Sequence, residues 1–242
     1  MRKEQNVSIT QPDRRGFLRT LVSAGPAAAL AVGAAPAVGH AVETPEAPGP
    51  AYAPRYFTAA EWRFLQAAAD ILIPADENGP GGATVGIPEF IDGQMEMPYG
   101  HGKLWFMGGP FHPEVEPELG YQLNLVPRDI YRLGIGNFDA WCAKTHGKPF
   151  ADLAAAEQIA AMHELESGRI VFADVPSATF FGFLLTNTKE GFFADPIYGG
   201  NKGMASWKMI GFPGVRADYM DWIDRPNAAY PYGPVSISGE RA

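Results

Sequence analysis

Apolar residues recur along this chain at helical spacing, whereas the alternating pattern of a β-strand does not appear over any length. The clearest case is residues 58–73, where apolar side chains follow one another at intervals of three and four. Thr58 and Glu61 have the spacing of a capping box, which satisfies the first free N–H groups of a helix. Pro74 ends the segment, because the residue before a proline disfavours helical geometry. The chain is therefore predicted to be all-α.

Four further segments predict helices. They are 87–97, 119–147, 151–168 and 177–193. The last of them is the most apolar, so we expect it to be the central buried helix. Pro127 is expected to break or kink the second segment into a helix pair, and Gly147 to cap its end. Asp152 is expected to cap the third.

Glycine and proline, with 28 and 22 residues, make up about a fifth of the chain, which is more than the usual share. The 12% aromatic and 46% hydrophobic content nevertheless argues against disorder and for one sizeable core. We therefore predict a single, irregular helical domain. Its long loops, rich in glycine, proline and aromatic residues, are expected to be ordered at 99–116 and 195–214.

The net charge of −8 understates the acidity of the folded part. Residues 1–41 contain five basic and two acidic residues, so the remainder contains 14 basic and 25 acidic residues, a net charge of −11. A domain this acidic is repelled by nucleic acid, and we expect no nucleic-acid partner.

The N-terminal region has the composition of an export signal. Basic residues are followed by an apolar run rich in alanine and glycine, with no charge between Arg19 and Glu43. The sequence RR-x-F-L-R resembles the signal read by the twin-arginine translocase. Its signal residues are Arg14, Arg15, Phe17 and Leu18. That route exports proteins that are already folded. We therefore expect the chain to be exported to the periplasm.

The chain is divided accordingly into three parts. Residues 1–41 are the predicted twin-arginine signal peptide, with a small-residue cleavage site near its end. Residues 42–57 are a Pro-rich linker, and 58–242 form the helical domain. The alternative is that 21–38 stays in the membrane as an anchor, although its glycines and prolines make it a weakly hydrophobic span.

The residues that usually carry chemistry are sparse. Cys142 is the single cysteine, so the chain has no intramolecular disulfide, no CxxCH haem-attachment site and no iron–sulfur motif. Its apolar neighbours predict a buried thiol. A GxSxG elbow is missing, as is a GxGxxG turn between a strand and a helix. We therefore predict no catalytic residue and no cofactor site in this chain.

The five histidines form no HExxH or HxH motif. We therefore expect, as the first interpretation, that the chain has no metal site. His101 and His112 lie in the first aromatic loop and, with Glu114 or Glu116, could bind a metal ion. The alternative function is therefore a free-standing periplasmic metal-dependent enzyme that uses His101 and His112.

Residues 195–214, DPIYGGNKGMASWKMIGFPG, cannot form an ordinary helix or strand throughout, because they contain five glycines and two prolines. The GGNKG sequence offers N–H groups and a lysine to a phosphate but lacks the GxxxxGK[ST] spacing. We interpret the segment as an ordered docking loop, with aromatic residues and Met209 as anchors. The alternative is that these side chains pack on the chain's own helices. The predicted docking residues are Asp195, Tyr198, Gly199, Gly200, Asn201, Lys202, Trp207 and Phe212.

Five stretches together resemble one family, the small subunit (subunit 3, or gamma) of gluconate 2-dehydrogenase. They are the RR signal, TAAEWRFLQAAADILIPAD, GIPEFIDGQM, EGFFADPIYGGNKGMASWKMIGFPG and YMDWIDRP. The resemblance spans residues 10–230 and is most specific over ADPIYGGNKGMASWKMIGFPG. The long aromatic loop at 99–116 departs from the family pattern.

The resemblance implies a non-catalytic accessory subunit of a membrane-associated, flavin-dependent sugar or polyol dehydrogenase. A large flavoprotein subunit of the glucose–methanol–choline type would carry FAD and oxidise the substrate. A multihaem cytochrome c subunit would pass the electrons on. The small subunit would bind and stabilise the large one and export it through the twin-arginine translocase to the periplasmic face of the cytoplasmic membrane. This division of labour fits a chain with an export signal and no cofactor motif.

Overall fold

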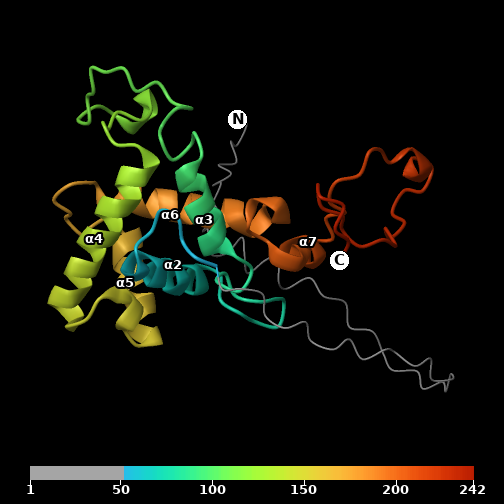
Figure 1. Ribbon diagram of the computed structural model, residues 1–242, viewed down its shortest axis with the longest axis horizontal. Coiled ribbons are helices and arrows are strands. Elements are labelled where there is room, and N and C mark those ends of the chain that lie inside the picture. Colours follow the sequence, from blue (N-terminus) through green and yellow to red (C-terminus); the bar gives the residue numbers. More distant parts are fainter. Residues whose placement is uncertain (1–51) are drawn as a thin grey trace, which may run out of the picture. The chain divides into compact units, whose positions relative to one another are not determined.

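The computed structural model describes residues 52–242, which belong to one compact unit (Figure 1). The α-helices of this part are α2 (Ala59–Leu72), α3 (Ile87–Glu96), α4 (Pro127–His146), α5 (Ala155–Glu166), α6 (Ser177–Phe193) and α7 (Ala205–Ile210). Within it, extended pairing is limited to isolated β-bridges. The all-α class is therefore confirmed, whereas the predicted signal at 1–41 and most of the predicted linker lie outside the described residues.

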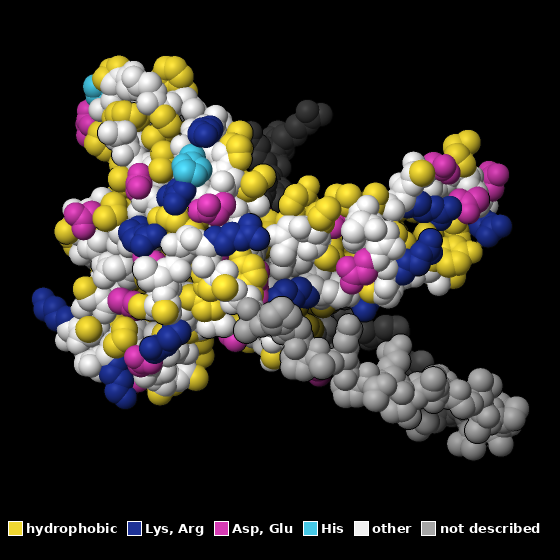
Figure 2. Space-filling model, viewed as in Figure 1, with side chains coloured by type: hydrophobic (Ala, Val, Ile, Leu, Met, Phe, Trp, Pro, Cys, Tyr) yellow, Lys and Arg dark blue, Asp and Glu magenta, His cyan; other side chains and the backbone are white. Residues whose placement is uncertain are grey.

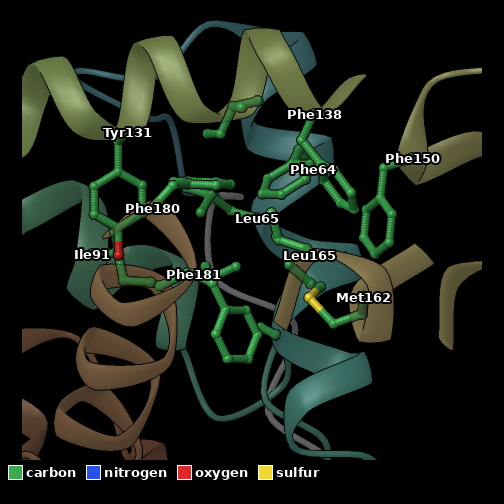
Figure 3. Close-up of a cluster of buried hydrophobic side chains, with 14 of the residues drawn as sticks. Phe64, Leu65, Ile91, Tyr131, Phe138, Phe150, Met162, Leu165, Phe180 and Phe181 are labelled. Atoms are coloured by element: carbon green, nitrogen blue, oxygen red, sulfur yellow. The ribbon is translucent and has the colours of Figure 1, made fainter. Parts of the chain in front are cut away.

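Helix α6 is the centre of the domain, as its apolar sequence predicts. It contacts α2, α3, α4, α5 and α7. The ring of Phe180, on α6, lies 6.0 Å from that of Phe64 and 6.1 Å from that of Tyr131 (Figure 3). Phe138 and Phe150 extend this cluster, with 5.3 Å between their rings. All five side chains are fully buried, so one aromatic core joins the helices.

Local signals placed several helix ends correctly. The capping box at the start of α2 is present: the Glu61 carboxylate accepts the Thr58 N–H at 2.8 Å, and the Thr58 hydroxyl accepts the Glu61 N–H at 3.4 Å. Helix α2 stops at Leu72, just before Pro74. Gly147 caps α4 in the left-handed conformation, with φ of 81°. Cys142 is buried, as its apolar neighbours predict.

Two sequence-based expectations were wrong. Pro127 does not separate two helices but stands in the first turn of α4, where its missing N–H costs nothing. Only a short 3-10 turn, Pro117–Leu119, precedes it in the segment expected to hold the partner helix. Asp152 does not cap α5, because that helix begins three residues later at Ala155. It lies in a 3-10 turn and forms an ion pair with Arg63 of α2.

A buried carboxylate holds the segment that precedes α2. We call residues 52–57 the N-terminal strap. Asp92, on α3, is 0% exposed and accepts four hydrogen bonds from the strap. The donors are the Tyr52 hydroxyl at 2.8 Å and the backbone N–H groups of Arg55, Tyr56 and Phe57 at 2.8, 3.0 and 3.2 Å. Since a buried charge is costly unless it is hydrogen-bonded, this arrangement ties the strap firmly to α3.

Candidate docking surface

The segment 195–214 folds into short turns and one short helix rather than an open loop. Two 3-10 turns, Pro196–Tyr198 and Lys202–Met204, precede α7. Left-handed residues separate these elements, among them Asn201 with φ of 47° and Met204 with φ of 53°. Backbone of this kind is strained for residues other than glycine and persists only where its surroundings hold it in place.

Three buried side chains hold the segment in place. Asp195 accepts the N–H of Ile197 at 3.0 Å and so caps the first turn. Asn201 is fully buried; its amide donates to the carbonyl of Ala194 at 2.9 Å, and its side-chain oxygen accepts the N–H and hydroxyl of Ser206. Trp207 is only 5% exposed and donates its indole N–H to the carbonyl of Phe193 at 2.9 Å. The backbone of this segment is therefore fixed against the end of α6.

Gly200 permits the closest approach to α6. A Cβ added there would lie 2.2 Å from the carbonyl oxygen of Gly191, a distance that no side chain tolerates. On the other side, the Lys202 ammonium pairs with Glu89 of α3 at 2.6 Å, and its backbone N–H donates to Val85. With its lysine and this N–H group already engaged, the GGNKG sequence does not fit a phosphate.

The outer side of this segment is apolar and faces solvent. Tyr198 and Phe212 are 54% and 44% exposed. We define the docking face as the exposed large apolar side chains of residues 193–212: Phe193, Ile197, Tyr198, Met209, Ile210 and Phe212. Hydrophobic side chains are visible over the end of α6 and over the C-terminal segment (Figure 2). Several exposed large apolar side chains gathered in one short ordered segment are typical of protein–protein contacts.

The eight predicted docking residues thus divide into two groups. Tyr198 and Phe212 are on the docking face, together with the predicted anchor Met209. The remaining six hold the backbone beneath the docking face, which we call its frame, or pair with α3. Their contacts are therefore within this chain. Sequence reasoning did not single out Phe193, Ile197 and Ile210. Of these, Phe193 was open to inference, because two consecutive phenylalanines on one helix cannot both face the core.

The first aromatic loop does not gather metal ligands. The Nε2 of His101 lies 2.7 Å from the guanidinium of Arg128, and His112 contacts Glu114 at 3.2 Å in an exposed position. Across residues 52–242, no three His, Cys, Asp or Glu side chains are placed to share a metal ion. A pocket of about 570 Å³ opens in this loop, between Trp105, Phe111 and Tyr121, and no charged side chain lines it.

Two ionisable groups with a raised pKa, Cys142 and Tyr131, are part of the core. Burial raises the pKa of the Cys142 thiol to about 12, with a smaller contribution from Asp139. Burial likewise raises the pKa of Tyr131, whose hydroxyl donates to Asn187 at 2.9 Å. A thiol held protonated is a poor nucleophile. Both groups belong to the core, and the docking face contains neither.

None of the helices in the described part is long and apolar enough to cross a membrane. In comparisons with known proteins, a family model, gluconate 2-dehydrogenase subunit 3, matches residues 59–214, which is more than half of the chain. The matched range begins with α2 and ends with the segment that forms the docking face. No curated protein and no solved structure matches.

Proposed function

The chain belongs to the gluconate 2-dehydrogenase subunit 3 family, and on that premise we propose that it is the non-catalytic small subunit of a periplasmic, flavin-dependent dehydrogenase complex. The family name implies a subunit of a multi-subunit enzyme. In this proposal the large subunit is a flavoprotein of the glucose–methanol–choline type that carries FAD and oxidises a sugar, sugar acid or polyol. A multihaem cytochrome c is the third member.

The observation that carries the proposal is the docking face on its fixed frame. Six large apolar side chains are exposed on backbone that Asp195, Asn201 and Trp207 hold in one conformation. A surface that is already ordered loses little conformational entropy on association, which favours tight binding. The frame also explains why polar and glycine residues accompany the aromatic ones in this segment: they shape the surface rather than react.

We assign the flavin to the partner because, within the described residues, neither the GGNKG segment nor the pocket beside Trp105 fits a nucleotide well. Lys202 is paired with Glu89, and its N–H donates to a carbonyl of the same chain. The aromatic pocket has no charged side chain to meet a pyrophosphate. A pyrophosphate site would require free N–H groups at a helix start or basic side chains.

Co-purification tests the docking face. We expect a tagged chain to emerge from the periplasm with a flavoprotein and its flavin absorbance. Replacing Ile197 and Tyr198 together by serine should weaken that binding at least tenfold, about 1.4 kcal/mol, because two exposed anchors are lost. Ile159→Ser, an equally exposed residue on α5, is the matched control and should bind normally. A chain that emerges alone, without flavin, refutes the complex.

Export is tested at the signal. We propose that Arg14 and Arg15 direct both this chain and its bound large subunit through the twin-arginine translocase. Replacing both by lysine should leave the two proteins in the cytoplasm, as followed by cell fractionation. Normal export of the large subunit in that mutant would exclude the escort role while leaving the docking proposal open to its own test.

A further inference from the structure

The chain beyond the docking face forms a second feature, which we call the C-terminal arm, residues 216–232. It leaves the end of α7 and returns to it, and in Figure 1 it loops away from the helices. Its base is closed by backbone hydrogen bonds: the Val215 N–H donates to the Val235 carbonyl at 2.7 Å, and the Val235 N–H donates to Pro213. The Ile237 N–H donates at 2.7 Å to Asp195, the same carboxylate that caps the docking segment. The segment that follows the arm and the docking segment thus share an anchor.

The arm has its own internal order. The guanidinium of Arg216 donates to the Tyr230 hydroxyl at 3.0 Å and pairs with Asp221 at 2.5 Å. The Tyr230 ring lies 5.4 Å from Trp222 and 5.5 Å from Tyr232. Among the residues that the structure describes, every hydrogen bond and ring contact of 216–232 joins two residues of the arm. The arm is therefore shaped by itself and not by the helices.

The arm is not covered by the rest of the described chain. None of its residues is buried. Met220 and Ile223 are 72% and 67% exposed, and Tyr219 and Tyr232 are exposed beside them. The indole nitrogen of Trp222 is shielded from solvent yet has no acceptor within the described chain. Exposed apolar side chains on an ordered projection, with an unused donor, are typical of a surface that another molecule covers.

We propose that the C-terminal arm clasps the large subunit that covers the docking face, an inference that rests on the proposed function. Along the chain, exposed apolar side chains recur from Phe212 of the docking face through Val215 to Tyr219 and Met220 of the arm. Asp195 caps the docking segment and also accepts the N–H of Ile237, a few residues after the arm, so the base of the arm lies beside the docking face and one partner reaches both. A preformed arm adds contact area at low entropic cost, and its main effect falls on dissociation, because the partner must release two surfaces at once.

The test uses the co-expressed complex with the small subunit captured on a sensor surface. Met220→Ser combined with Ile223→Ser should accelerate dissociation of the large subunit at least tenfold. Val171→Ser, at a site 94% exposed and outside both surfaces, is the matched control and should leave dissociation unchanged. Because all three side chains are exposed, the variants are expected to fold, and circular dichroism of each checks this.

Hydrogen exchange at the arm's backbone amides is a second, independent measurement. Amides of 216–232 should exchange rapidly in the isolated chain and at least tenfold more slowly in the complex. Suppose that dissociation and exchange are both unchanged while the docking-face variant still binds more weakly. The proposal that the arm contacts the large subunit is then overturned, and the proposed function stands. If neither the arm nor the docking-face variant affects binding, the proposed function fails. An isolated chain that is dimeric, and that Met220→Ser with Ile223→Ser makes monomeric, identifies a second copy as the occupant and also overturns the proposal.

Discussion

Replacing Asp92 by asparagine is the sharpest test of how the N-terminal strap is held. The two carboxylate oxygens accept four hydrogen bonds, two each: Oδ1 from the N–H groups of Tyr56 and Phe57, and Oδ2 from Tyr52 and Arg55. Asparagine keeps the shape but turns one oxygen into an NH₂ group, which cannot accept a hydrogen bond. The variant therefore loses at least two of the four bonds, as well as the charge that strengthens the others.

The magnitude follows from the burial of the site. A hydrogen bond to a charged group contributes about 1.5–3 kcal/mol, so two of them set a range of roughly 3–6 kcal/mol. The strap is short and can detach so that its N–H groups reach water, which limits the loss to the lower end. We expect Asp92→Asn to reduce the free energy of unfolding by about 3 kcal/mol.

Urea unfolding followed by circular dichroism measures this loss, and hydrogen exchange locates it at the amides of Arg55, Tyr56 and Phe57. Asp224→Asn, at an exposed carboxylate, is the control and should change the unfolding free energy by less than about 0.5 kcal/mol. If Asp92→Asn is equally harmless and those three amides exchange as slowly as before, the reasoning on the strap is refuted.

Three further outcomes are expected from the purified chain. Gly200→Ala should lower the unfolding free energy by about 2 kcal/mol, because its Cβ would meet the backbone of α6; Gly136→Ala, in open space on α4, should not. Trp207→Phe removes the indole N–H from the Phe193 carbonyl and should cost about 1–3 kcal/mol in urea unfolding. The raised pKa of Cys142, about 12 in the folded chain against 9.0 ordinarily, means that the unfolded thiol loses its proton first as the pH rises. Stability should therefore fall above about pH 9, by up to about 1.4 kcal/mol per pH unit, and Cys142→Ala should remove the part between pH 9 and 10.

Local signals were sufficient for much of the fold. The capping box at Thr58, the apolar run from Ser177 and the terminating Gly147 each act within one or two helical turns, so the sequence alone identifies them. The predictions for Pro127 and Asp152 were wrong because each residue type is common in two different positions. A proline ends one helix or begins the next, and an aspartate caps a helix or pairs with a distant arginine; only the tertiary contacts decide between them.

The candidate site was predicted as a segment but not as a surface. Glycines, prolines and aromatic residues marked 195–214 as an ordered turn region. They could not tell that Trp207 faces α6 while Tyr198 faces solvent, because the segment has no helical or strand period from which to assign sides. The role of Asp92 could not be predicted from the local sequence either, because its four donors come from a segment that lies 35 to 40 residues earlier in the chain.

The central position of α6 has a consequence for the order of events during synthesis. Helices α2 and α3 emerge from the ribosome first, but their apolar faces pack against α6, which is made much later. Non-local contacts of this kind delay folding, so the early helices stay incompletely packed until residue 193 has been translated. The docking face begins at that same residue and rests on the end of α6. Assembly on the nascent chain is thus disfavoured, and the proposed docking face becomes available only once the core beneath it exists.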